Sequence, residues 1–408
     1  MAYEIVDINP DNLEQLARVA HVAFGDTFKP ERLEDEQAVV EYDRMLGVAD
    51  GADLVASAGV YSFDLTLPGN AIVPMAGVTW VSCLPSHRRR GILTQMMRHQ
   101  LDDVASRGEA LAGLGASEAV IYNQFGYGVA SQYASARIRK SRARLRTGSS
   151  AGGRMRMVWE DERLKVLAPI FDEWRRQRPG AVNRTDGRWE VILRDREYER
   201  HGASTWFFAV HEDDTGRPDG YVGYRIKGDD DDYRTVVVEE LVAIDPEVEL
   251  SLWEFVFGVD LTDTVEARVD SLDSQLPWRL ADQRAYQYTL VHDHLWLRVM
   301  DAEAALSART YSTEDSLVLE LVDPFRPDGA AAGRFRVAGG PDGATCERET
   351  SASADITVPV EALGSAYMGT VRWTTLAAAN RVSGSPDALR RADAMFASTP
   401  LPFCNTDF

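Results

Sequence analysis

A strand that leads into a basic loop and then into an amphipathic helix is the feature that most limits how this chain folds. The apolar run Val78–Leu84 indicates the strand, Arg88–Gly91 is the basic loop, and Gly91–Ser106 has the apolar spacing of a helix. Three arginines at a helix N-terminus oppose the helix dipole, so the arrangement favours a bound anion. Gly91 lets the backbone approach a phosphate, and the first-turn N–H groups are free to bind it. The pattern predicts a phosphate-binding turn; the alternative is a charged solvent loop that only caps the helix.

Other common sites do not fit the chain. The loop lacks the Gly-Lys-Ser/Thr of a nucleotide P-loop, and its single glycine excludes a dinucleotide-binding fingerprint. The seven histidines show no metal-ligand spacing, and His292-x-His294 is typical of strand alternation, so no metal is expected. No Gly-x-Ser-x-Gly elbow is present, and Cys83 within a strand is interpreted as a packed thiol.

The first segment, to about residue 150, alternates between helix and strand patterns. Apolar spacing predicts a helix, two long strands, a helix, a buried strand and a short helix or turn, in the order Asn12–Phe24, Leu54–Leu67, Ile72–Leu84, Gly91–Ser106, Ala110–Leu114 and Glu118–Phe125. This order implies a mixed α/β sheet.

The pattern recurs after a Gly/Ser-rich break at Thr147–Gly153, which we interpret as a linker. The second copy has a helix, a hairpin, a strand and a helix at Leu164–Gln177, Trp206–His211, Gly220–Ile226, Val236–Ile244 and Glu247–Gly258. Asp245-Pro246-Glu247 replaces the basic loop, so phosphate binding is expected to be lost in this copy. The acidic run Asp229–Asp232 is interpreted as a solvated hairpin tip.

A third segment from about Met300 combines short strands and helices. Its strands are expected at Leu317–Val322, Arg334–Val337 and Ile356–Pro359, and its helices at Ala362–Tyr367, Thr374–Asn380 and Pro386–Phe396. The predicted domains are therefore residues 1–147, 154–298 and 299–408.

Charge and composition limit the partners. The 408 residues include 44 basic and 64 acidic side chains, a net charge of −20, which disfavours nucleic acid and anionic lipid. The surplus suits a cationic substrate, although solubility alone also explains it. No run approaches the roughly 20 apolar residues of a membrane span, and the first residues lack the basic start and apolar run of a secretory signal, so neither is expected. Three widely spaced cysteines argue against a disulfide framework, so a cytoplasmic location is expected.

Two motifs resemble those of a known family. Arg88-Arg89-Arg90-Gly91-Ile92-Leu93 resembles the Gln/Arg-x-x-Gly-x-Gly/Ala pyrophosphate loop of GNAT acetyltransferases, except that Leu93 stands where a small residue is usual. Eis-type (enhanced intracellular survival) acetyltransferases share that departure, and Ala116–Gly128 resembles their second signature. The resemblance covers the whole chain. It implies an α/β (α+β) fold of two tandem GNAT-like domains, the second degenerate, followed by a sterol-carrier-protein-like α+β domain.

The resemblance also implies an acetyl-CoA site. It places the pantetheine arm along Val81, Ser82 and Cys83, and the pyrophosphate on Arg89, Arg90, Gly91, Ile92, Leu93 and Thr94, with Ser117 and Glu118 also lining the cofactor site. Tyr122 would be the general acid that protonates the departing thiolate. From the residues alone, Tyr122 in Ile121-Tyr122-x-x-Phe125 is equally a buried aromatic.

The acceptor side is implied at both ends of the chain. The α-carboxylate of the terminal residue, Phe408, would be the general base, although a free α-carboxyl with a pKa of about 3.5 is a weak base unless it is desolvated. Phe24, Asp26 and Asp407 would bind the substrate. From the residues alone, Asp26 is equally interpreted as a helix-end or turn residue.

The sequence therefore predicts an acetyl-CoA-dependent N-acetyltransferase. It would transfer acetyl groups directly, in a ternary complex, to primary amines of polycationic acceptors such as aminoglycosides, polyamines or lysine side chains. The resemblance implies a homo-oligomer, specifically a hexamer. The alternatives are a non-catalytic CoA or amine sensor, and a carrier of apolar ligands acting through residues 300–408.

Overall fold

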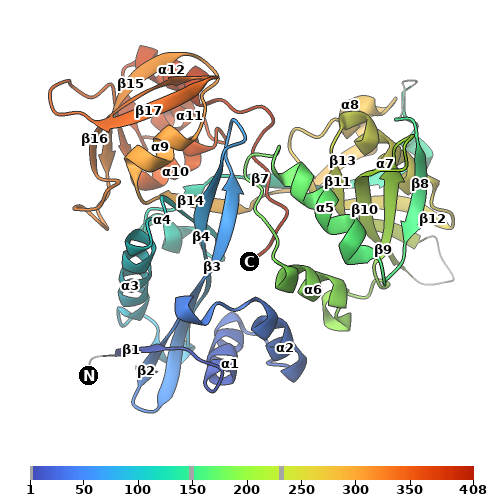
Figure 1. The fold of residues 1–408 in the computed structure, drawn as a ribbon, viewed down its shortest axis with the longest axis horizontal. Coiled ribbons are helices and arrows are strands. Elements are labelled where there is room, and N and C mark those ends of the chain that lie inside the picture. The colour runs from blue at the N-terminus through green and yellow to red at the C-terminus, as the bar shows by residue number, and fades with distance from the viewer. Residues whose placement is uncertain (1–2, 147–150, 229–233) are drawn as a thin grey trace. The chain divides into compact units, whose positions relative to one another are not determined.

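The computed structural model describes residues 3–146, 151–228 and 234–408. The chain forms two compact units (Figure 1). The first comprises the residues up to Ser131, His294–Pro402 and Thr406–Phe408, and the second comprises Gln132–Asp293 and Phe403–Asn405. The domain limits expected from the sequence, residues 1–147, 154–298 and 299–408, stay a prediction. Residues 147–150 of the predicted linker and the run Asp229–Asp232 lie outside the described residues.

The first unit is built on a mixed sheet with seven strands among the described residues. In spatial order they are β1 (Glu4–Asp7), β2 (Met45–Asp50), β3 (Asp53–Thr66), β4 (Ile72–Cys83), β5 (Leu111–Gly115), β14 (Leu295–Val299) and β6 (Gly128–Val129). Its helices are α1 (Leu13–Phe24), α2 (Pro30–Val39), α3 (Ile92–Ser106) and α4 (Ala119–Asn123). The helices and strands predicted for this segment are therefore present. The strand β14 comes from much later in the chain.

Helices α1 and α3 cover opposite faces of this sheet. Met45 and Leu54 pack with α1 in one core, whereas their neighbours Leu46 and Val55 pack with α3 in another. Successive residues of a strand point to opposite faces, so the two helices lie on the two sides. The apolar stripe of each helix thus determines which face it covers.

The rest of the first unit is a five-stranded sheet with four helices in the described chain. Its strands are β17 (Gly343–Arg348), β16 (Gly333–Gly340), β15 (Asp315–Val322), β18 (Ile356–Pro359) and β19 (Ser383–Gly384), and its helices are α9 (Ala302–Ala308), α10 (Val360–Tyr367), α11 (Trp373–Ala378) and α12 (Pro386–Phe396). Helix α10 lies directly on β14, since a Cβ on Gly364 would lie 2.2 Å from the Leu297 carbonyl oxygen. This close contact joins the third segment to the first sheet.

The second unit repeats the sheet-and-helix plan, again with seven strands in its described part. They are β13 (Tyr286–Asp293), β7 (Gln132–Arg139), β12 (Thr262–Ser271), β11 (Arg234–Ala243), β10 (Pro218–Lys227), β9 (Phe207–Glu212) and β8 (Arg154–Val158), with helices α5 (Arg163–Arg175), α6 (Asp186–Arg194), α7 (Pro246–Gly258) and α8 (Leu276–Arg279). A side chain caps the N-terminus of helix α7, because the Asp245 side chain accepts a hydrogen bond from the Glu247 amide at 2.8 Å. An acidic cap at this position is unfavourable for a phosphate.

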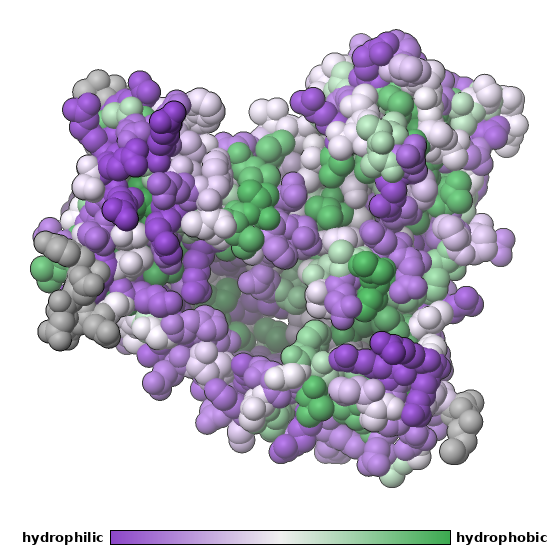
Figure 2. All heavy atoms as spheres, turned by 180° about the vertical axis from the view of Figure 1, so that it is seen from behind, coloured by the Kyte–Doolittle hydropathy of each residue, from purple (hydrophilic) through white to green (hydrophobic). Residues whose placement is uncertain are grey.

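Polar and charged side chains cover much of the face shown in Figure 2, with apolar residues in separate clusters. This agrees with the 26% of residues that are charged. Among the described residues, no helix has both the length and the apolar character needed to cross a membrane.

Candidate active site

The sheet of the first unit opens between β4 and β5. Within the described residues, these strands pair in parallel only over Met75–Gly77 against Leu111–Gly113. Beyond that point β4 continues along β3, whereas β5 continues along β14. The facing edges at Val78–Val81 and Gly115–Ser117 consequently have backbone groups that a ligand can use.

A β-bulge in β4 lies at the opening. Trp80 and Val81 lie opposite a single residue of β3, Ala58, and Trp80 has a positive φ of 57°. The buried hydroxyl of Ser57 holds this shape, because it bonds to the Trp80 carbonyl at 2.6 Å and lies 2.6 Å from Ser82 Oγ. The bulge therefore takes the backbone beside Val81 out of the regular ladder.

The basic loop starts α3 with its amide donors uncovered. Arg89 and Gly91 have positive φ values of 62° and 82°, a conformation that glycine adopts readily. Gly91 is the N-cap of α3, and no side chain caps the first turn. A Cβ on Gly91 would meet nothing within 4 Å. The turn thus presents free N–H groups and the positive end of the helix dipole to a ligand.

A cavity of about 660 Å³, here called the donor cavity, lies against this turn. Its charged and titratable side chains are His87, Arg88, Arg89 and Glu118, together with Cys83 and Tyr122. The other lining residues are Ala23, Phe24, Val81, Ser82, Gly91, Ile92, Leu93, Thr94, Ser117 and Ile121. The surplus of positive charge suits an anionic ligand.

The donor cavity brings together all the predicted cofactor residues except Arg90. The Nη1 atom of Arg90 donates to the Tyr3 hydroxyl at 3.0 Å, and the residue does not line the cavity. Arg88 does line it, and its guanidinium donates to the Ala23 carbonyl at 2.8 Å and the Cys83 carbonyl at 3.3 Å.

Tyr122, at the end of α4, is buried in the core with its ring edge-on to Tyr127. Burial raises the pKa of the phenol, a nearby Glu118 adds to that effect, and a hydrogen bond with Ser117 opposes it. The phenol therefore stays protonated at neutral pH.

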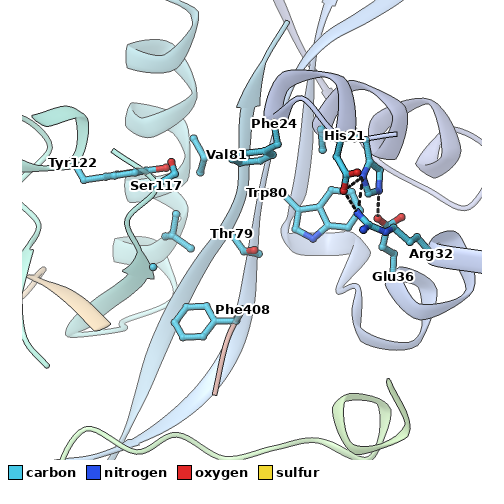
Figure 3. A pocket seen from close by; sticks show the side chains of 14 residues that line it. His21, Phe24, Arg32, Glu36, Thr79, Trp80, Val81, Ser117, Tyr122 and Phe408 are labelled. Atoms are coloured by element: carbon cyan, nitrogen blue, oxygen red, sulfur yellow. Dashed lines mark hydrogen bonds and ion pairs between the residues drawn. The ribbon is translucent and has the colours of Figure 1, made fainter. Parts of the chain in front are cut away.

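A second cavity, of about 420 Å³ and here called the acceptor cavity, meets the first at the opening. The two share Phe24, Val81, Ser117 and Tyr122. The remaining lining residues are Ala20, His21, Asp26, Arg32, Glu36, Val78, Thr79, Trp80, Gly115 and Phe408. Figure 3 shows Tyr122 on one side of this cavity and His21, Arg32 and Glu36 on the other.

The ionisable side chains on the far side form one cluster. His21 Nε2 lies 3.1 Å from Glu36 Oε1, and Arg32 Nη1 lies 3.2 Å from His21 Nδ1. Arg32 also forms an ion pair with Asp26. Burial raises the pKa of Glu36 to about 7, against the opposing effect of Arg32, and burial lowers the pKa of His21.

The carboxyl terminus contributes one of its two predicted site residues to the acceptor cavity. The ring of Phe408 packs on Phe63 with the centroids 4.7 Å apart, and Phe408 lines the cavity. Asp407 does not line it; Asp407 Oδ1 lies 2.7 Å from His294 Nε2, and its side chain is 98% exposed.

Sequence reasoning missed His21, Arg32, Glu36 and Trp80. Pro30, followed by several helix-forming residues, was a signal for the start of α2, where Arg32 and Glu36 lie. Nothing local indicated that this helix would contact the end of α1.

The fold and this opening define the class of protein. Residues 4–130 and 180–299 each match a family model described as an acetyltransferase (GNAT) domain, and residues 302–405 match a sterol carrier protein domain. The chain is therefore a GNAT-fold acetyltransferase with a sterol-carrier-like third part, which confirms the predicted fold class. Acetyltransferases of this fold use acetyl-CoA.

Within that class, the chain belongs to the Eis family of N-acetyltransferases. It is 34% identical to the N-acetyltransferase Eis of Mycobacterium tuberculosis over 392 residues, 93% of each chain. It is 40% identical to an uncharacterised N-acetyltransferase of Streptomyces avermitilis over 372 residues, 90% of each chain. The crystal structure of Eis1 from Mycobacterium abscessus, 34% identical, matches with a TM-score of 0.87 and 100% coverage of both chains. The predicted family is confirmed, and the chain is an N-acetyltransferase.

Proposed function

We propose that this protein transfers the acetyl group of acetyl-CoA directly to a primary amine of a cationic acceptor: an aminoglycoside, a polyamine or a lysine side chain. The observation that carries the proposal is the pair of cavities that meet at Val81, Ser117 and Tyr122. One cavity is rich in basic side chains and amide donors, and the other contains carboxylates.

The donor cavity fits the phosphates and thioester arm of acetyl-CoA. The uncapped first turn of α3 and the side chains of Arg88 and Arg89 would hold the pyrophosphate. The strand edge at Val81, Ser82 and Cys83 would pair with the amide groups of the pantetheine arm, much as a further strand would.

Acetyl-CoA supplies an activated thioester. The acceptor nitrogen attacks its carbonyl carbon, the C–S bond breaks, and the nitrogen loses a proton. Backbone N–H groups beside Val81 would stabilise the developing oxyanion, and the protonated phenol of Tyr122 would give its proton to the departing sulfur. The cavities would align the two reactants, which supplies much of the rate enhancement.

Cys83 supports direct transfer over an acetylated cysteine intermediate. It lines the donor cavity, but burial raises the pKa of its thiol, in spite of Arg88 and Arg90. A neutral thiol is a poor nucleophile.

We expect Cys83→Ala to keep kcat within about threefold of the wild-type value. A steady-state assay of thiol release measures kcat, and Ser82→Ala is measured in the same assay for comparison. Loss of all activity in Cys83→Ala alone would contradict direct transfer.

The carboxylate of Phe408 would assist deprotonation of the amine, directly or through water, because its residue lines the acceptor cavity. Asp407, beside it, would add negative charge for a cationic acceptor.

We further propose that the protein is a cytoplasmic homo-oligomer, with the hexamer as the expected form. No disulfide joins Cys83, Cys346 and Cys404 in the described structure, which suits a reducing compartment. Light scattering of the purified chain would measure its mass.

The test is thiol release from acetyl-CoA with a panel of amines, measured for the wild type, Tyr122→Phe and a variant extended by several residues beyond Phe408. Amine-dependent release that falls in both variants supports the proposal. Activity that survives the extension would remove the terminal carboxylate from the mechanism. Binding of acetyl-CoA with no release for any amine would overturn the proposed function.

A further inference from the structure

Asp26, the acidic residue expected to meet the acceptor, is already engaged by the protein. Its Oδ1 accepts a hydrogen bond from the Thr27 amide at 2.8 Å, and its Oδ2 forms an ion pair with Arg32 and lies 3.8 Å from His21 Nδ1. The backbone bond to Thr27 and the bond to Arg32 hold the pKa of Asp26 below its usual range. The carboxylate is thus ionised, and its main partners are internal.

Arg32 is held in place by the start of α2 and by its neighbours. Pro30 lies in the first turn of the helix, and the Arg32 side chain is only 26% exposed. Its guanidinium lies between Asp26 and the His21 ring, on the side of the cavity opposite Tyr122 (Figure 3). A fixed positive charge therefore lines the region that the far end of a long acceptor would reach.

The charges on this side nearly cancel. Asp26 and Arg32 form a pair, and His21 is mainly neutral at neutral pH because burial and Arg32 lower its pKa. Glu36, with a pKa of about 7, is only partly ionised there. A polycation would have to compete with Arg32 for Asp26, whereas an amine of low charge would not.

We propose that Arg32 is a specificity-determining residue that neutralises Asp26 and directs the enzyme toward acceptors with one or two positive charges. The inference rests on the proposed function and narrows its substrate class, from polycations toward short mono- and diamines and single lysine side chains. The alternative is that Arg32 only stabilises the packing of α2 against α1.

The experiment measures kcat/KM for butylamine, 1,4-diaminobutane and spermine. It compares the wild type, Arg32→Gln, Asp26→Asn and the double variant. Arg107→Gln is the matched control, because Arg107 also forms ion pairs, with Asp43 and Asp103, has a 35% exposed side chain, and lines neither cavity.

Arg32→Gln is expected to raise the ratio of spermine to butylamine kcat/KM by between about fivefold and about tenfold, because it leaves Asp26 free to bind an ammonium group. The gain should disappear in the double variant, and Arg107→Gln should not change the ratio. An equal fall for all three amines in Arg32→Gln would overturn the proposal, since it would show that Arg32 only supports the helix. A gain that persists without Asp26 would overturn it too.

Calorimetric titration of the same amines, with CoA present, separates this inference from the proposed function. If the wild type binds acetyl-CoA but acetylates no amine, the proposed function fails, and the relative amine affinities of the same variants still decide the role of Arg32. A spermine-to-butylamine affinity ratio that rises in Arg32→Gln supports the inference, and an unchanged ratio contradicts it.

Discussion

Asp26 and Glu36 line the same cavity, yet their surroundings shift their proton affinities in opposite directions. Asp26 accepts hydrogen bonds from Thr27 and Arg32, which favour its charged form. Glu36 is mostly buried, with a side chain that is 18% exposed, and burial favours its neutral form. The protonation state of each carboxylate in this cavity therefore depends on its local contacts and not on the net charge of the protein.

Replacing Glu36 changes how stability depends on pH. The folded state keeps the Glu36 proton up to a pKa of about 7, whereas the unfolded chain loses it near 4.5. The stability this contributes is fully present below pH 4.5 and is lost as the pH rises through 7. Glu36→Gln has no such proton, so its free energy of unfolding relative to the wild type should rise across this window by on the order of 3 kcal/mol.

Urea unfolding at a series of pH values measures this difference. Glu14→Gln on the exposed face of α1 is the control, since it removes a carboxylate that pairs with Arg18 outside the cavity. A Glu36→Gln difference that is flat with pH, or that falls as pH rises, would show that Glu36 is not buried as described.

At the scale of secondary-structure elements, the bulge in β4 depends on one buried hydroxyl. Ser57 bonds to the Trp80 carbonyl and lies within hydrogen-bond distance of Ser82 Oγ. Ser57→Ala removes both contacts and should cost about 1–2 kcal/mol of stability. Because the backbone beside Val81 would also lose its fixed position, we expect kcat to fall more than KM rises.

Ser62→Ala is the control for this prediction. Ser62 lies on the same strand, but its hydroxyl contacts Glu41 and Arg44 and it does not line the cavities. Urea unfolding and steady-state kinetics of both variants give the two readouts. A Ser57→Ala enzyme with unchanged kcat would show that the bulge keeps its shape without the serine.

The elements at the site differ in how well the sequence predicts them. Strand β4, the basic loop and helix α3 were predicted because their signals are local: an apolar run, a glycine next to arginines, and a helical stripe. The Arg32–Asp26 pair was not, because it depends on how α2 packs against the end of α1. The position of β14 between β5 and β6 could not be predicted either, since the sequence of a buried apolar strand does not indicate which strands it pairs with.

On the scale of the whole molecule, the first sheet and the third segment share one buried ion pair. Arg298 on β14 pairs with Asp323, which follows β15, and both side chains are 1% exposed. Arg298 Nη1 also donates to the Phe125 carbonyl at 2.6 Å, in the turn that follows α4. The third segment is thus tied to the turn beside Tyr122.

Arg298→Met should lower the free energy of unfolding by about 3–5 kcal/mol, because Asp323 would keep a buried charge without its partner. Thermal unfolding measures the loss, and the double variant Arg298→Met/Asp323→Leu should recover a large part of it. A double variant as unstable as Arg298→Met would mean that the unpaired carboxylate is not the cause.

A single-turnover reaction with carbonyl-labelled acetyl-CoA distinguishes direct acyl transfer to an amine from transfer through an acetylated protein. Mass spectrometry would follow the label in the acceptor and in the protein, with thiol release measured in parallel, for the wild type and Tyr122→Phe. We predict one labelled acetyl group on the amine for each thiol released, none on the protein, and a rate about 10²–10⁴-fold lower in Tyr122→Phe. Label on the protein, or thiol released without an acetylated amine, would show that the acetyl group is not transferred directly.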